Sequence, residues 1–296
     1  MKAFQYLAPV APFGYVAPST LAELFETLDA YGPKARVIAG GTDVMIALKL
    51  RLIRPEVVVD LSRLRSQLAG IVVKDSSLTI GAMTTYTEAE RDQSVKRFAR
   101  ALAVAASQVG TLQIRNLGTI GGNLANASPA ADCAPPLIAL SAKVHIKGSG
   151  GERTLPVEEF FTGVKKSSLR PGEIVTSVEI PASERVSSFW MRSARRNENV
   201  ISVVSVAVAS RIQGNRFGES RVALGAVAPT PILAKESSSA LSGSTVSKES
   251  IEKAASLAAR ECTPISDVRA SAQYRRHLVG VLTRRTIEEL VEAAGA

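Results

Sequence analysis

The chain has 296 residues, of which 46% are hydrophobic and 21% charged, so it is long enough for two domains or three small ones. Aromatic residues make up only 5%, so the cores are expected to consist of Ala, Val, Leu and Ile. This composition excludes a disordered chain, a collagen-like repeat and a coiled coil. The 36 Lys and Arg against 27 Asp and Glu indicate either an anionic partner or simply a soluble surface.

The N-terminal third predicts a helix, a strand, a glycine turn and a second helix, in that order. Thr20 and Glu23 have the spacing of a capping box, and an apolar stripe over residues 21–28 follows until Gly32 and Pro33 end the helix. A short β-like run at residues 36–39 leads through Gly40 and Gly41 into a helical pattern at 44–50. Further strands are predicted at residues 57–59, 71–73 and 78–80.

The middle of the chain combines a predicted helix with a long uncharged segment. Residues 95–109 read as one helix that Gly110 ends in the C′ position. Residues 110–140 are rich in Gly, Asn, Ser and Pro, without periodicity and almost without charge, which favours a binding loop over disorder. Strands are predicted at residues 144–146, 154–155 and 174–180.

The last part is expected to begin at the charged, serine-containing segment 182–188. Residues 202–209 alternate enough for a half-buried strand, and residues 221–225 predict another. Helices are predicted at 248–260 and 271–294. Strands followed by helices indicate an α+β architecture in both parts rather than a doubly wound sheet.

Two glycine turns carry the chemistry that a cofactor phosphate needs. In residues 39–43 the missing side chains let backbone N–H groups approach a ligand, and a helix N-terminus follows, which Thr42 or Asp43 could cap. Residues 119–123 repeat this arrangement with consecutive N–H donors, a hydroxyl and an amide. Neither turn matches GxGxxG or GxxxxGK[ST], so a Rossmann domain or a nucleotide hydrolase is not indicated.

The remaining candidate features favour structural roles. The two histidines, His145 and His277, have no clustered carboxylates and are not expected to bind a metal. The basic cluster at residues 192–196 is either solvated surface or a neutraliser of a bound diphosphate. The basic C-terminal helix, with Arg275 and Arg276, lacks interleaved aromatics, so it is interpreted as solvated or partner-facing rather than as a nucleic-acid site.

The chain is expected to be soluble and cytoplasmic. Its first six residues lack the apolar core of a signal peptide, and the most apolar run, 200–209, is too short to span a bilayer. Cys133 and Cys262 lie far apart and form no CxxC pair. This chain is therefore expected to hold no iron–sulfur cluster and no Cys-rich zinc site, and its cysteine content suits a reducing compartment.

Residues 39–43 and 114–132 closely resemble the FAD-binding medium subunit of the molybdenum hydroxylases, a family that includes the medium subunit of carbon monoxide dehydrogenase and the flavin domain of xanthine dehydrogenase. The likeness begins at residues 13–18, includes 171–181 and covers nearly the whole chain. It implies a vanillyl-alcohol-oxidase (PCMH)-type FAD-binding domain at residues 1–181, with subdomains of about 1–66 and 67–181. The second subdomain would be built around a mixed sheet, and a C-terminal α+β domain would span 182–296.

The resemblance also implies the cofactor positions residue by residue. They are Val37, Ile38, Ala39, Gly40, Gly41, Thr42, Asp43 and Val44 in the first loop, Gly118, Thr119, Ile120, Gly121, Gly122 and Asn123 in the second, and Val109, Asp132, Val175, Arg192 and Val200 around them. Arg192 stands where the family often has lysine, and Arg196 matches the family's arginine. Asn199 and Val200 replace an Asp and an aromatic residue or isoleucine, which puts the packing of the flavin ring in doubt. No catalytic acid–base residue and no metal ligand is implied in this chain.

The implied function is electron relay within a complex, which we expect to be a dimer of heterotrimers. A large partner would hold molybdopterin and hydroxylate an N-heterocycle, a purine or an aldehyde, and a small partner would carry two [2Fe–2S] clusters whose electrons reach FAD and then an external acceptor. Two alternatives remain: a self-sufficient FAD-dependent reductase of the same superfamily, and a basic nucleic-acid-binding module.

Overall fold

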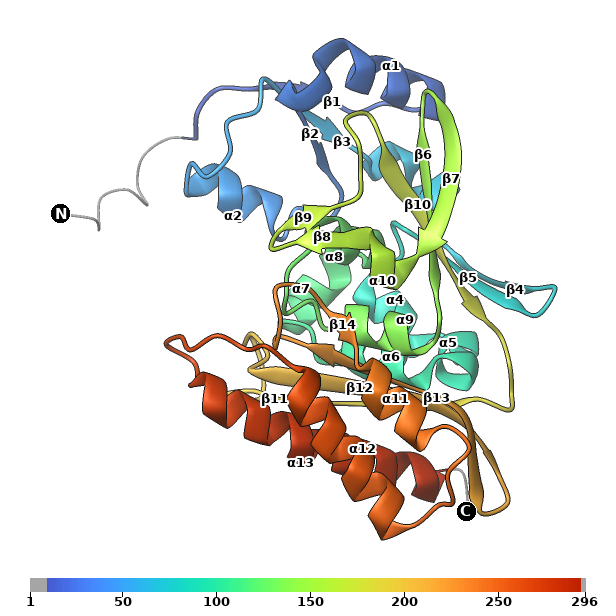
Figure 1. The fold of residues 1–296 in the computed structure, drawn as a ribbon. Helices are drawn as coiled ribbons and strands as arrows, with labels where there is room; N and C mark the ends of the chain where they lie inside the picture. Colours follow the sequence, from blue (N-terminus) through green and yellow to red (C-terminus); the bar gives the residue numbers. More distant parts are fainter. Residues whose placement is uncertain (1–9, 294–296) are drawn as a thin grey trace.

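The computed structural model of the protein describes residues 10–293 and contains three stacked layers, each built on its own sheet (Figure 1). The N-terminal layer is at the top of the figure, the middle layer follows, and the C-terminal layer with its long helices is at the bottom. Residues 1–6, on which the expectation about a signal peptide rests, lie outside the described residues. Within residues 10–293 no helix is long and apolar enough to cross a membrane.

The N-terminal layer is a three-stranded parallel sheet in the order β1-β3-β2, formed by Gly14–Val16, Val57–Asp60 and Ala35–Ile38. Helix α1 (Leu21–Tyr31) connects β1 to β2 and packs Leu24 and Leu28 into the same core as the buried strand β3. Helix α2 (Val44–Lys49) follows β2. The predicted order of helix, strand, glycine turn and helix is confirmed.

Thr20 caps α1 as predicted, because its hydroxyl accepts a hydrogen bond from the Glu23 N–H at 3.2 Å. The Glu23 carboxylate accepts from the Ser19 N–H rather than from Thr20, so the reciprocal half of the predicted capping box is displaced by one residue. Gly32 is the C-cap residue, with a φ of 51° that favours glycine.

Replacing Thr20 by alanine is expected to lower the free energy of unfolding by about 1 kcal/mol, because the Glu23 N–H loses its partner at the helix end. Thr27→Ala is the matched control. Its hydroxyl bonds only the Glu23 carbonyl within the same helix, and alanine has the higher helix propensity. Urea denaturation of both variants measures the difference; equal midpoints would contradict the capping role.

The middle layer is a five-stranded sheet in the order β4-β5-β10-β6-β7, formed by Ile71–Lys74, Ser77–Gly81, Ile174–Pro181, Lys143–Gly148 and Gly151–Pro156. Every pairing in it is antiparallel, so the implied mixed sheet is wrong. β10 lies at the centre of the sheet, because it pairs with β5 on one side and with β6 on the other. The residues of β5 precede their partners in β10 by about 100 positions.

The helices of this layer correct two predictions. The single helix expected at 95–109 is two helices, α5 (Gln93–Phe98) and α6 (Arg100–Ser107), because Ala99 leaves the helical region with φ −142° and ψ 47°. α6 ends before Gln108, so Gly110 (φ 55°) lies in the following turn and not at C′. The segment 110–140 is not an irregular loop but contains α7 (Leu112–Leu117), α8 (Ile120–Ala125) and α9 (Ala134–Ala139). Helices of six residues are too short to show helical periodicity.

Smaller elements complete the first two layers. They are α3 (Arg65–Leu68), α4 (Tyr86–Arg91), α10 (Val157–Phe160), the hairpin of β8 (Phe161–Gly163) and β9 (Lys166–Ser167), and 3-10 turns at Gly32–Lys34 and Ser62–Leu64.

The C-terminal layer is an antiparallel sheet in the order β11-β12-β13-β14, formed by Ser187–Ser193, Val204–Gln213, Arg216–Gly225 and Ile232–Leu233. One face is covered by α11 (Lys235–Leu241), α12 (Lys248–Glu261) and α13 (Ala272–Ala293), as Figure 1 shows. β11 has no counterpart among the predicted strands, and it starts inside the segment 182–188, where the last part of the chain is expected to begin.

The central strand β12 is buried on both faces, so the prediction of a half-buried strand is wrong. Val206 and Val208 pack in the core under α12 and α13, whereas Ala207 and Ala209 pack in the core of the middle layer. The alternation in this strand is therefore one of side-chain size, because both neighbouring layers are apolar.

Arg275 also departs from its prediction, because its side chain is only 3% exposed. Its guanidinium donates to the carbonyls of Val203 and Ala226, each at 2.9 Å, and to the Asp267 carboxylate at 2.7 Å. This arginine fastens α13 to the sheet and does not belong to a solvated or partner-facing surface.

Candidate functional site

The first glycine turn presents a row of unused donors. Five consecutive backbone N–H groups, from Gly40 to Val44, donate no hydrogen bond to any residue within 10–293. Gly41 has a φ of 71°, a backbone conformation that glycine adopts without strain. The expected cap by Thr42 or Asp43 is not formed, which leaves the turn open to a ligand.

The second turn is arranged differently from its prediction. The N–H groups of Ile120 and Gly121 donate to the carbonyls of Thr84 and Ala82, and those of Gly122 and Asn123 donate to Thr119. The expectation of consecutive free donors at residues 119–123 is therefore wrong. The N–H groups of Ile120 and Gly121 join α8 to the segment after β5, and those of Gly122 and Asn123 bond Thr119 at the start of α8.

The glycines of the second turn have distinct roles. A Cβ on Gly121 would lie 2.5 Å from the Ala82 Cβ, so this glycine allows the close approach of α8. A Cβ on Gly122 would meet only the Thr119 hydroxyl, at 2.8 Å, and otherwise points into open space. A larger side chain at position 122 would therefore project from the second turn into unoccupied space.

The fold brings the two turns into direct contact. A Cβ on Gly40 would lie 1.7 Å from the Leu117 carbonyl oxygen, so the first turn touches the backbone that leads into the second. Lys165, in the turn between β8 and β9, donates to the Asn126 carboxamide at 2.9 Å and lies 3.9 Å from the Asp43 carboxylate. Lys165 is not among the predicted site residues, since nothing in its local sequence marks it.

These groups fit the diphosphate and ribityl portions of FAD. Unused N–H donors suit phosphate oxygens, and Lys165 adds a positive charge beside them. The Asn123 Oδ1 atom is buried and has no hydrogen-bond partner within 10–293, which leaves an acceptor available to a hydroxyl. Burial raises the pKa of Tyr86, which packs beside Gly118, well above its ordinary value, so this phenol stays neutral.

Asp132 and Arg192 form a buried ion pair. Their side chains are 8% and 4% exposed, and the Arg192 guanidinium donates to Asp132 Oδ2 at 3.1 Å. Ser202 donates to Asp132 Oδ1 at 2.6 Å, and Gln108 accepts from the Arg192 Nε–H at 3.2 Å. Burial raises the pKa of Asp132 to about 6, although Ser202 and Arg192 act in the opposite direction. Gln108 and Ser202 were not predicted, because each belongs to the site only through these long-range contacts.

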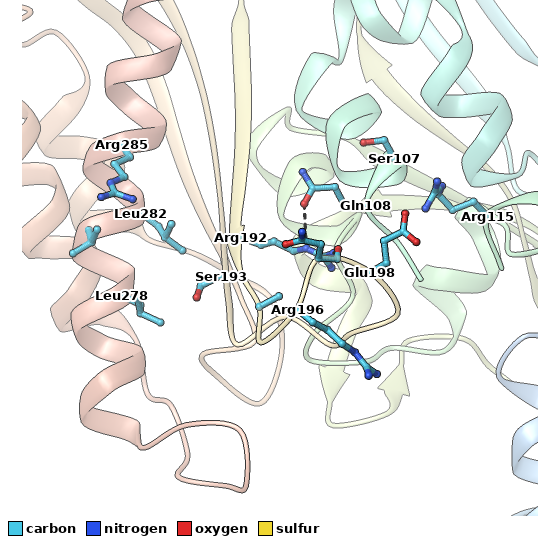
Figure 2. Close-up of a pocket in the computed structure, with 13 residues that line it drawn as sticks. Ser107, Gln108, Arg115, Arg192, Ser193, Arg196, Glu198, Leu278, Leu282 and Arg285 are labelled. Carbon is cyan, nitrogen blue, oxygen red and sulfur yellow. Dashed lines mark hydrogen bonds between the residues drawn. The ribbon is translucent and has the colours of Figure 1, made fainter. Parts of the chain in front are cut away.

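A pocket of about 610 Å³ adjoins this pair, between the middle and C-terminal layers. Figure 2 shows Gln108 and Arg192 on one side of it and Leu278, Leu282 and Arg285 of α13 on the other. Arg196 also lines the pocket, and its guanidinium bonds the Asn199 carbonyl. All three arginines of the basic cluster have partners within the protein, because Arg195 also donates to the Val268 carbonyl, at 3.1 Å.

The other predicted positions lie around these groups. The Asn199 N–H donates to the Gly110 carbonyl at 3.0 Å, which places the segment of Val200 beside that of Val109. Val175 is only 5% exposed and belongs to the middle core. His145 bonds Glu179 and Thr154. No group of His, Cys, Asp and Glu within 10–293 could hold a metal ion.

Comparison with known proteins agrees with this fold and site. Residues 11–183 match the family model described as the FAD binding domain in molybdopterin dehydrogenase, and residues 189–290 match the CO dehydrogenase flavoprotein C-terminal domain. The chain belongs to the family of FAD-binding medium subunits of the molybdenum hydroxylases.

Individual relatives support the same assignment. The chain is 36% identical to the xanthine dehydrogenase FAD-binding subunit of Escherichia coli O157:H7 over 95% of its length and 97% of the relative. It is 32% identical to the carbon monoxide dehydrogenase medium chain of Hydrogenophaga pseudoflava, over 93% and 96% of the two chains. A solved structure of the enzyme from that organism superposes with a TM-score of 0.92 at 31% identity, over 96% of this chain and 98% of the other. The quinoline 2-oxidoreductase of Pseudomonas putida 86 superposes with a TM-score of 0.91 at 31% identity, over 97% and 99%.

Proposed function

We propose that this chain is the FAD-binding subunit of a heteromeric molybdenum hydroxylase. It would take electrons from the [2Fe–2S] clusters of a small partner and pass them through FAD to an external acceptor, while a large partner hydroxylates an N-heterocycle, a purine or an aldehyde at its molybdopterin site. The observation that carries the proposal is the row of five unused N–H donors at Gly40–Val44, in a chain of this family. FAD, when bound, supplies the two-electron chemistry.

The residues of this chain would bind and orient the cofactor. We propose that residues 37–44 hold the diphosphate and that residues 118–123 line the ribityl portion. Asp132, Arg192, Val200 and Val109 would lie near the flavin ring of the cofactor. Val175 would pack behind these residues, in the core of the middle layer. The donors at Gly40–Val44, the open side of Gly122 and the contact between the two turns support this arrangement.

We further propose that the FAD-binding domain spans residues 1–181, with subdomains of about 1–66 and 67–181, and that the C-terminal domain spans 182–296. The two matched family regions, 11–183 and 189–290, support the boundary near residue 182, and the three sheets, each with its own hydrophobic core, support the further division of the first domain. The middle core continues across the boundary, because Ala207 and Ala209 of β12 pack in it. The complex is proposed to be a cytoplasmic dimer of heterotrimers.

Replacing Gly122 by leucine is expected to abolish FAD binding while the chain still folds, because the side chain would enter the space in front of the second turn. The cofactor content per chain, from the flavin absorbance of the purified protein, and the circular dichroism spectrum measure the two effects. Gly150→Leu is the control, since nothing lies within 4 Å of a Cβ there. A Gly122→Leu variant with full flavin content would contradict the proposed site.

Isolation of the complex tests the relay. The expected result is co-purification of this chain with a molybdopterin-binding chain and an iron–sulfur chain, and bleaching of the flavin absorbance when the organic substrate is added. A yellow chain that purifies alone and reduces its own substrate would instead indicate the self-sufficient reductase.

A further inference from the structure

The pair of Asp132 and Arg192 joins two parts of the chain that are far apart in sequence. Asp132 precedes α9 in the middle layer, whereas Arg192 lies in β11 and Ser202 precedes β12 in the C-terminal layer. Ser202 is fully buried, and its hydroxyl bonds Asp132 Oδ1 at 2.6 Å. The contact is the shorter of the two side-chain hydrogen bonds to this carboxylate.

The two oxygens of Asp132 are divided between two donors. Ser202 occupies Oδ1, so the remaining oxygen, Oδ2, is turned toward the Arg192 guanidinium at 3.1 Å. Arg192 uses its other nitrogens on Gln108 Oε1, at 3.2 Å, and on the Asn197 carbonyl, at 3.3 Å. A guanidinium that donates to three separate acceptors has one orientation, and the orientation of the Asp132 carboxylate contributes to it.

We propose that Ser202 is a positioning residue of the cofactor site. By donating its hydroxyl proton to Asp132, it keeps that carboxylate turned toward Arg192 and thereby fixes the guanidinium at the flavin end. This inference rests on the proposed FAD binding. Ser202 acts through Asp132 and Arg192 and need not touch the cofactor.

Another buried serine in the same region offers a matched control. Ser205, in β12, is 1% exposed, and its hydroxyl has no hydrogen-bond partner within 10–293. Removing either hydroxyl deletes one oxygen atom from a buried position near the start of the same strand. Only Ser202→Ala leaves a buried carboxylate oxygen without its donor.

The test compares Ser202→Ala and Ser205→Ala in the full-length chain, in the wild-type background and in an Arg192→Lys background. The measurements are the dissociation constant for FAD, the flavin absorption spectrum and the melting temperature. Ser202→Ala is expected to weaken FAD binding at least tenfold and to shift the flavin spectrum, whereas Ser205→Ala leaves both unchanged. In the Arg192→Lys background, where the fork of hydrogen bonds is absent, Ser202→Ala is expected to cause less than a threefold further loss.

Three results would overturn the inference. The first is wild-type FAD affinity in Ser202→Ala, even if the melting temperature falls, because that outcome is purely structural. The second is an equal loss of affinity in both backgrounds. The third is a loss in Ser205→Ala as large as that in Ser202→Ala. A wild-type chain that binds no FAD would refute the proposed function itself and the inference with it.

Discussion

Replacing Asp132 by alanine is expected to lower the free energy of unfolding by about 3–5 kcal/mol, because it leaves the Arg192 guanidinium buried without its counter-charge. Only 4% of the Arg192 side chain is exposed, so the guanidinium depends largely on its protein partners. The remaining partners of Arg192 are a carboxamide and a backbone carbonyl, which carry no net charge. Denaturation of the full-length chain by guanidinium chloride, followed by circular dichroism, measures the loss of stability.

An exposed ion pair provides the control for this prediction. Lys34 and Glu56 lie 2.8 Å apart, but their side chains are 63% and 56% exposed. Glu56→Ala is therefore expected to leave the denaturation midpoint close to that of the unmodified chain. If Asp132→Ala and Glu56→Ala destabilised the chain equally, the buried pair would not have the energetic role described here.

Replacing Gly40 by alanine is expected to cost about 3 kcal/mol of stability and to remove FAD from the protein, because the new methyl group would overlap the Leu117 carbonyl at 1.7 Å. The overlap is with backbone, so no side chain can rotate away to relieve it. Either the first turn or α7 must move, and both flank the candidate cofactor site.

The flavin content and the denaturation midpoint of Gly40→Ala are to be compared with those of Gly150→Ala. A Cβ on Gly150 has no neighbour within 4 Å, so this substitution is expected to change neither quantity. Wild-type flavin content and stability in Gly40→Ala would show that the two turns are not in the contact described.

The sequence predicted the elements whose signals are local. The Thr20 cap, the glycine turn after β2 and the strand β10 follow from neighbouring residues and were found in place. The three short helices between residues 112 and 139 were not predicted, because six residues complete fewer than two turns and show no apolar stripe.

The candidate site was predicted as two separate motifs. Their sequences do not show which of their polar groups form hydrogen bonds within the protein and which stay free for a ligand. The donors of Ile120 and Gly121 are occupied by carbonyls of Thr84 and Ala82, about 37 residues earlier, so the second turn lacks the row of free donors that the first turn has. Asp132 and Arg192 were both expected near the cofactor, but their pairing across 60 residues was not. Such pairings depend on how the layers stack, which no local pattern encodes.

The contact between Gly40 and the Leu117 carbonyl also constrains how this protein can evolve. Position 40 cannot acquire a side chain while α7 keeps its place, because the new Cβ would overlap the Leu117 carbonyl. A side chain at position 40 therefore requires a compensating change in the backbone at residue 117, although 77 residues separate the two positions. Variation among descendants of this chain should accumulate instead at glycines such as Gly150, whose surroundings are empty.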